Sequence, residues 1–205
     1  MYFIPSAERA RIREAVEAAE AMTSAELVAV VARRADAYLY VPLLVAAVAA
    51  LLAAGIALLV EPALPAHLLY AGQVALFAVL SLVLRIPPLL MACVPRPIKR
   101  RRARRMAREV FIDLGLLNTQ ARTGVLFFVA AGEHHVEIVA DRGVAAVIDD
   151  AAWQAVVDRF VADVKRGAVG EGFVAAIAAC GELLARRLPA GPGDRNELRD
   201  RLIEL

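Results

Sequence analysis

Two long apolar runs dominate the pattern of this chain. Val41 to Val60 contains twenty residues without a charge, and a helix of that length, at about 1.5 Å per residue, reaches roughly 30 Å, the hydrocarbon thickness of a bilayer. A second uncharged run, Ala66 to Leu84, is interrupted only by His67, Gln73 and Ser81. Both runs are predicted to be transmembrane helices. The alternative is that they are two buried helices of a soluble core.

The ends of the two runs predict their orientation. Glu61 to Pro65 is long enough only for a tight turn on the far side of the membrane, and Pro87 and Pro88 should kink or break the second helix before a short apolar extension, Leu89 to Val94. Basic residues precede the first run and follow the second, and basic flanks stay in the cytoplasm. We therefore predict two spans in the cell membrane with both termini cytoplasmic.

The segment before the first run alternates apolar and charged positions. Ser6 to Met22 has the spacing of an amphipathic helix, and Ala25 to Ala32 is a short valine-rich run typical of a buried strand. One helix and one strand bury too little surface to be stable alone. Their partners are therefore expected beyond the membrane segment.

The segment after the second run supplies those partners. A helix is predicted over Arg100 to Leu117, followed by two strands, Gly124 to Ala130 and Val136 to Ala140, that should form a hairpin. Further helices are predicted after Asp149 and Asp150, which are suited to cap one, and over Glu171 to Leu188. The last residues, Arg195 to Leu205, are predicted to be a charged helical tail.

These elements together predict an α/β fold. It is an α/β/α sandwich with a small mixed sheet, interrupted by a two-helix transmembrane hairpin. The expected division is 1–35 for the first helix and strand, 36–94 for the hairpin, 95–190 for the rest of the domain and 191–205 for the tail.

Composition and charge add one feature. Hydrophobic residues make up 60% of the chain, and the net charge of +2 conceals a basic cluster after the second run. Without the cluster, the chain has 16 Lys and Arg residues and 22 Asp and Glu residues, so the remainder is acidic. The cluster comprises Arg96, Lys99, Arg100, Arg101, Arg102, Arg104, Arg105 and Arg108.

Because the cluster follows a membrane span and lacks interleaved aromatic residues, anionic lipid headgroups rather than nucleic acid are its expected partner. Other membrane proteins are further candidate partners.

The two cysteines do not indicate a metal site or a disulfide. Cys93 and Cys180 have no spacing suited to a zinc site or a disulfide framework, so both are predicted to be buried, inert thiols.

Three phrases of the sequence carry a family resemblance. They are Thr23-Ser24-Ala25-Glu26-Leu27-Val28, Arg122 to Val129, and Val136 to Val144, in that order, and Trp153 and the stretch from Gly167 to Leu188 fit the same pattern. They resemble the TPM domain, also called the TPM phosphatase family, in a membrane-anchored bacterial-type member. The resemblance implies an α/β/α sandwich and, for some members, phosphatase activity or binding of a divalent metal. Metal-competent members have an Asp-Asn pair where this chain has Arg122-Thr123, and a cation there would repel a metal.

Three carboxylates are the candidate metal ligands. Asp141 follows the second hairpin strand, where ligand sites are common in open α/β sheets, and Asp149 and Asp150 could join it to hold Ca²⁺ or Mg²⁺. Capping of a turn and of a helix explains the same residues without a metal. His134 and His135 should point to opposite faces of a turn, a geometry that does not suit two ligands of one metal.

Three functions remain open on the sequence. The first is a non-catalytic binding or assembly factor for membrane proteins at the cytoplasmic face. The second is a divalent-metal-dependent phosphatase using Asp141, Asp149 and Asp150. The third is a homo-oligomeric structural membrane protein that assembles through the small residues Ala46, Ala50, Ala53 and Ala54.

Overall fold

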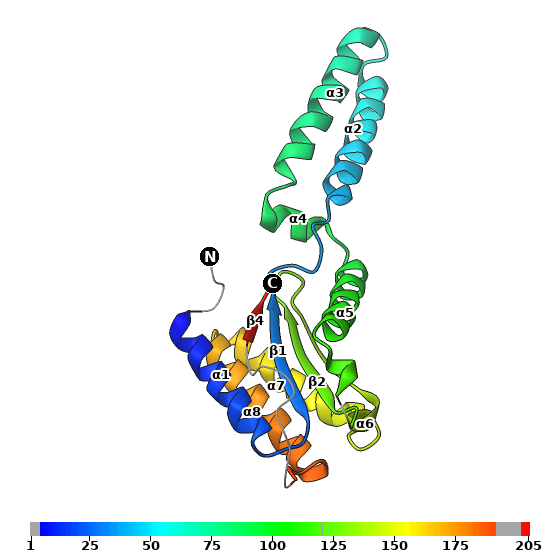
Figure 1. The fold of residues 1–205 in the computed structure, drawn as a ribbon. Coiled ribbons are helices and arrows are strands. Elements are labelled where there is room, and N and C mark those ends of the chain that lie inside the picture. The colour runs from blue at the N-terminus through cyan, green and yellow to red at the C-terminus, as the bar shows by residue number, and fades with distance from the viewer. Residues whose placement is uncertain (1–4, 120, 192–201) are drawn as a thin grey trace. The chain divides into compact units, whose positions relative to one another are not determined.

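The computed structural model describes residues 5–119, 121–191 and 202–205. The chain divides into two compact units (Figure 1): one comprises Met1–Ala35 and Arg100–Leu205, and the other, Asp36–Lys99, is inserted between these two stretches. A helix and a strand from before the insertion thus fold with the segment that follows it. The predicted mixed α/β fold is confirmed.

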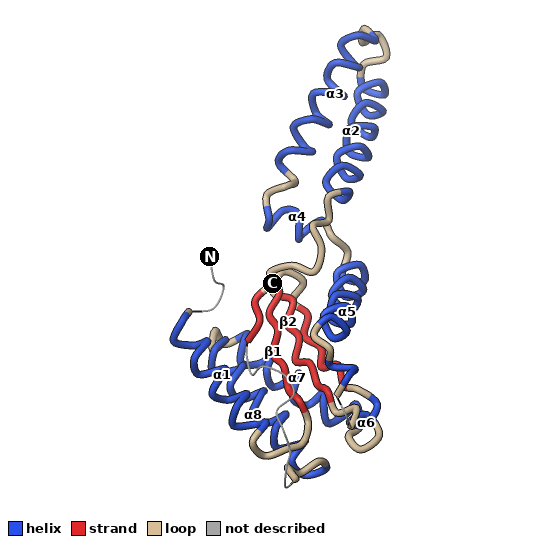
Figure 2. The backbone as a smooth tube through the Cα atoms, in the orientation of Figure 1, coloured by secondary structure: helices blue, strands red, loops and turns tan. Residues whose placement is uncertain are grey.

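The sheet of the first unit has four strands in the order β3-β2-β1-β4 (Figure 2). They are β1 (Glu26–Ala32), β2 (Gly124–Ala130), β3 (His135–Ala140) and β4 (Leu202–Glu204). β1 is parallel to β2 and to β4, whereas β2 and β3 form the predicted antiparallel hairpin. Every residue of β1 and β2 is buried, which explains why both are apolar without alternation.

Each face of the sheet carries a hydrophobic core. On one face, inward residues of β1 and β2 pack against α1 (Ser6–Glu20), α7 (Asp150–Lys165) and α8 (Val169–Arg187), with an edge-to-face group of Phe127, Phe160 and Phe173. On the other face, the alternate residues of the same strands pack against α5 (Arg96–Asp113) and the 3₁₀ turn Leu116–Asn118. The apolar strands are therefore covered on both sides.

The inserted unit is a helical hairpin. α2 (Tyr40–Val60) and α3 (Ala66–Val83) pack against each other and are joined by the short predicted turn. Pro87 and Pro88 do not continue α3. They begin a separate helix, α4 (Pro87–Cys93), because proline is tolerated in a first helical turn, where its missing N–H has no intrahelical acceptor. Tyr38, Val41, Leu90 and Val94 form a small buried cluster in this unit.

Some predicted boundaries were wrong. The basic helix begins at Arg96 rather than Arg100 and ends at Asp113, before Gly115, whose φ of 75° stops it. The short helix α6 (Arg142–Ala145), capped by Asp141, was not predicted.

The predicted helical tail was also wrong where the structure describes it: residues 202–204 form β4, and residues 195–201 lie outside the described part. A strand is favoured there because Leu202 and Ile203 each reach one of the two cores, which a helix could not arrange.

Candidate membrane-surface site

The basic helix α5 has two chemically distinct sides. Ala103, Ala107, Val110 and Phe111 are buried against the sheet, and small residues at the first two positions let the helix approach closely. The opposite side is exposed and carries Arg101, Arg105 and Arg108 at i, i+4 and i+7 spacing. Packing of the apolar side therefore fixes the direction in which the arginines point.

The predicted basic cluster lies within this one helix. Arg96, Arg100, Arg101, Arg104, Arg105 and Arg108 are exposed, and Lys99 and Arg102 are half-buried. Arg105 Nε lies 2.7 Å from Glu109 Oε1, one helical turn away. This exposed pair contributes about 0.3–0.5 kcal/mol and leaves the helix strongly positive.

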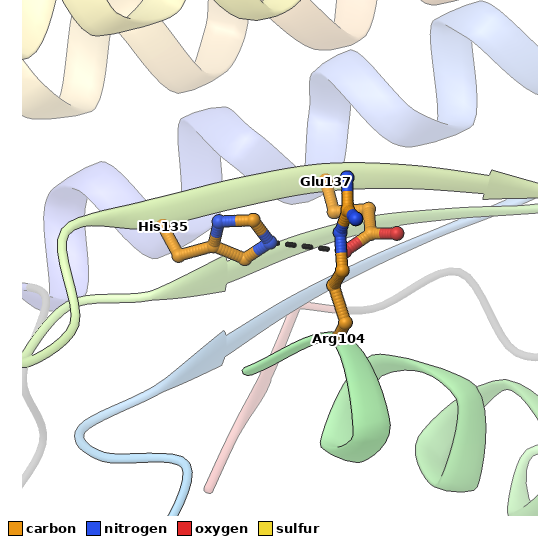
Figure 3. Close-up of polar contacts among 3 residues, drawn as sticks. All are labelled: Arg104, His135 and Glu137. Atoms are coloured by element: carbon orange, nitrogen blue, oxygen red, sulfur yellow. Dashed lines mark hydrogen bonds and ion pairs between the residues drawn. The ribbon is translucent and has the colours of Figure 1, made fainter. Parts of the chain in front are cut away.

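Arg104 reaches from α5 to the edge strand β3. Its Nε lies 3.6 Å from Glu137 Oε2, and His135 Nε2 lies 2.9 Å from the same oxygen (Figure 3). His135 and Glu137 are two residues apart in a strand, so their side chains share the face that α5 covers. A carboxylate can only accept, which places a proton on His135 Nε2.

This cluster defines the surroundings of Glu137 and His135. Glu137 pairs with an arginine rather than standing free in solvent. His135 was expected in a turn, but it begins β3 and its side chain is only 15% exposed, whereas His134 occupies the turn with a φ of 50°. The two-residue spacing of His135 and Glu137 was visible in the sequence, but the arrival of Arg104 was not.

Asp141 lies at a different edge of the sheet from the one expected. β3 is antiparallel to β2, so the residue after β3 lies beside Gly124, where β1 and β2 begin, and its N–H donates to Gly124 O at 2.9 Å. The rule that places ligands at the carboxyl ends of parallel strands therefore does not apply to Asp141. The error arose because a rule for parallel strands was applied to β3, which the predicted hairpin already made antiparallel to β2.

The Asp141 carboxylate is buried and caps α6. Its Oδ1 accepts a hydrogen bond from the N–H of Arg142 at 2.7 Å, and its Oδ2 lies 4.0 Å from Arg122 Nη1 with no hydrogen-bond partner. Gly143 makes this turn possible, because a Cβ there would lie 2.7 Å from Arg122 O. The capping role of Asp141 is thus observed, with the Arg122 guanidinium 4.0 Å away.

Asp149 caps α7 as predicted. Its Oδ1 accepts a hydrogen bond from the N–H of Ala152 at 2.8 Å, and Asp150 is the first residue of the helix. Among the residues that the structure describes, no group of three or more His, Cys, Asp or Glu side chains is arranged to hold a metal ion. Asp141, Asp149 and Asp150 are not part of such a group in the described residues, and a metal bound by them stays a prediction.

The hairpin helices expose most of their apolar side chains. α2 and α3 are each long and apolar enough to cross a membrane. In the most apolar 18-residue stretch of each helix, the buried share is only 11% for α2 and 0% for α3. Leu59 and Leu82, for example, are 85% and 71% exposed. This exposure does not fit the alternative of two helices buried in a soluble core.

Much of the small-residue face of α2 is turned toward α3. Ala46 and Ala50 are buried, and Ala50, Ala53 and Ala54 line a hollow of about 160 Å³ whose other wall includes Gly72 and Gln73 of α3. The alanines thus serve the packing of the hairpin itself.

The two cysteines differ. Cys180 is on the buried side of α8, and burial raises the pKa of its thiol to about 12, as expected for an inert thiol. Cys93 is only half-buried, so the prediction that both are buried holds for one of them.

Comparison with known proteins gives one family and one fold. Residues 89–183 match the model of the TPM domain family, and no curated protein matches the chain. The BA42 protein of the psychrophilic bacterium Bizionia argentinensis, solved by NMR, is similar in structure with a TM-score of 0.63 at 19% identity, covering 99% of this chain and 96% of that one. At that identity the similarity concerns the fold alone. From the family match, the chain contains a TPM domain.

Proposed function

We propose that this chain is a membrane-anchored TPM-domain protein that binds membrane proteins as an assembly or binding factor at the cytoplasmic face. The observation that carries the proposal is the exposed apolar surface of α2 and α3, inserted between two parts of one α/β domain. Exposed leucines such as Leu51, Leu52 and Leu59 favour leaving water by about 1.5–3 kcal/mol each. A bilayer is the solvent that covers such a surface on all sides.

The arginines of α5 support a role at the lipid surface. α5 begins three residues after α4 ends, so its first bases lie within a few residues of the apolar hairpin in the chain. Near an anionic leaflet each basic residue contributes about 1 kcal/mol. Basic residues on this side of the hairpin also favour a cytoplasmic location of the domain.

The carboxylate geometry supports binding rather than catalysis. Asp141 and Asp149 use carboxylate oxygens to cap α6 and α7, and the guanidinium of Arg122 lies 4.0 Å from Asp141. A fixed cation at that point lowers the attraction of the site for a metal ion.

Membrane fractionation tests the anchoring. The full chain should stay in the pellet after extraction at alkaline pH, and a hairpin-free variant, in which a Gly-Ser linker replaces residues 36–95, should be released. Release of the full chain would exclude the anchor. Single-cysteine variants, with the cysteine in α1 or in the turn after Val60, test the orientation. A membrane-impermeant thiol reagent added to intact cells should label the cysteine in the turn and leave the cysteine in α1 unlabelled.

Metal-dependent phosphatase activity is the second candidate, and one observation favours it: Asp141 Oδ2 is buried without a hydrogen-bond partner. This hypothesis expects phosphomonoester hydrolysis that requires Mg²⁺ or Ca²⁺ and is abolished by Asp141→Asn. Arg122→Gln should raise metal affinity, because it removes the neighbouring cation. Absence of calorimetric metal binding in both the parent and Arg122→Gln would remove this candidate.

A further inference from the structure

One amide side chain lies well inside the apolar helical hairpin. Gln73 is half-buried on α3, seven residues after the helix begins at Ala66, and it lines the hollow of about 160 Å³ between α3 and α2. The rest of the described lining consists of alanine, leucine and glycine, whose side chains form no hydrogen bonds. α2 therefore offers the Gln73 amide no side-chain partner.

Tyr70 is a second polar group without a partner on the same helix. It is 70% exposed and lies one helical turn before Gln73. Among the residues that the structure describes, neither the Tyr70 hydroxyl nor the Gln73 amide makes a hydrogen bond. An unpaired hydroxyl or amide is costly in the hydrocarbon of a bilayer, which contains no water to bond it. Both groups therefore favour a partner from outside the hairpin.

The two groups are complementary to each other. A hydroxyl and an amide each donate and accept hydrogen bonds. Two copies inserted with the same orientation hold these residues at matching depths, with Tyr70 of one copy about 4.5 Å along the helix axis from Gln73 of the other. Long side chains bridge such an offset. A two-fold axis along the membrane normal thus gives two equal Tyr70–Gln73 contacts, one from each copy to the other.

We propose that the hairpin forms a homodimer through α3, in which the Tyr70 hydroxyl of each copy hydrogen-bonds the Gln73 amide of the other. Interhelical hydrogen bonds and close packing, rather than exclusion of water, hold helices together in lipid. A second copy is favoured over an unrelated helix, because it always presents a hydroxyl and an amide at the matching depth. The proposal rests on the membrane anchoring proposed above and adds self-association to the binding role.

The contact lies on a different helix from the one that the sequence suggested for an oligomer. Ala46 and Ala50 of α2 are buried, and Ala50, Ala53 and Ala54 line the hollow that faces α3 of the same copy. They are therefore already used within one hairpin. The polar groups of α3 are what the hairpin leaves without a partner.

The first test measures association of the full chain in phosphatidylcholine vesicles. Donor and acceptor dyes on Ala63→Cys, in a Cys93→Ser background, report the dimer by energy transfer as the protein-to-lipid ratio rises; Cys180 is buried and stays unlabelled. Gln73→Leu should weaken the dimer roughly tenfold or more, because two interhelical hydrogen bonds are lost per dimer. Tyr70→Phe, which removes only the hydroxyl, should weaken it to a similar extent.

A double variant tests whether the two residues bond to each other. Gln73→Leu with Tyr70→Phe should associate no more weakly than the weaker single variant, since both changes remove the same hydrogen bonds. Gln73→Asn keeps a donor and an acceptor, so it should retain more affinity than Gln73→Leu. Ser81→Ala is the matched control on α3: the Ser81 hydroxyl oxygen is buried within the hairpin, so its removal should leave the dimer unchanged.

Cysteine cross-linking in native membranes identifies the side of α3 that forms the contact. Val74 lies one turn after Tyr70, whereas Val79, nine residues after Tyr70, lies on the opposite side of the helix. Both valines are exposed, at 47% and 59%. Val74→Cys should form an intermolecular disulfide under mild oxidation, and Val79→Cys, in the same Cys93→Ser background, should not.

Three outcomes would overturn the proposal. One is a chain that stays monomeric at every protein-to-lipid ratio. Another is a double variant whose loss equals the sum of the two single losses, which would mean that Tyr70 and Gln73 act separately. The third is equal cross-linking of Val74→Cys and Val79→Cys. Failure of the anchoring is distinct, because it releases the chain at alkaline pH, whereas a monomer that stays in the membrane pellet contradicts the dimer alone.

Discussion

The Cys180 thiol should be chemically silent in the folded protein. Burial raises its pKa from 9.0 to about 12, so the folded state holds the thiol proton more tightly than the unfolded state does. This stabilisation is complete below about pH 9 and is lost as pH rises toward 12, at roughly 1.4 kcal/mol per pH unit.

Iodoacetamide at pH 8 should therefore modify Cys180 only after denaturant is added, while the half-buried Cys93 serves as the internal control. Peptide mass spectrometry measures both sites. Rapid labelling of Cys180 without denaturant would show that the α8 core opens.

Asp149 and Asp150 should have unequal effects on stability. Asp149 accepts the capping hydrogen bond from Ala152, so Asp149→Ala should lower the free energy of unfolding by about 1 kcal/mol. Asp150→Ala, one position later, removes only a favourable charge at the helix start and should cost about 0.3–0.5 kcal/mol. Urea unfolding with and without Ca²⁺ measures both. A Ca²⁺-dependent stabilisation that both variants lose would instead support a shared metal site.

The α5 helix should bind anionic membranes through its exposed arginines. Arg101→Gln, Arg105→Gln and Arg108→Gln together remove three charges from one side, worth about 3 kcal/mol or roughly a hundredfold in affinity. Co-sedimentation of the hairpin-free variant with phosphatidylserine vesicles measures this change. A matched variant, Arg11→Gln with Arg159→Gln and Lys165→Gln, removes three exposed charges from α1 and α7.

The matched variant should retain most of the affinity. Rising salt should weaken binding of the parent, because exposed charges are screened beyond about 10 Å at 0.1 M. Equal losses in the two variants would mean that net charge, rather than α5, attracts the domain to the surface.

The α/β domain should fold without its inserted hairpin. Both hydrophobic cores of the sheet consist of residues outside Asp36–Lys99, so replacing residues 36–95 with a linker removes no member of either core. The far-UV circular dichroism should retain the strand signal, and unfolding should stay cooperative without detergent. A molten domain would show that the inserted unit supplies part of the folding energy.

The sequence by itself determined the elements whose signal is local. Apolar runs of about twenty residues predicted α2 and α3, valine-rich and phenylalanine-rich runs predicted β1 and β2, and Asp149 predicted the start of α7. Helix periodicity and capping depend on neighbours within a few residues, so they can be read without a fold. The need for β1 to pair beyond the hairpin followed from the same reasoning, because an isolated strand cannot satisfy its backbone.

Only the tertiary structure decided which distant segments meet. It turned residues 202–204 into the strand beside β1, placed Asp141 where the parallel strands begin, and brought Arg104 from α5 to Glu137 on β3. The common reason is that strand order and direction are set by the burial of both sheet faces at once, and no residue encodes them locally.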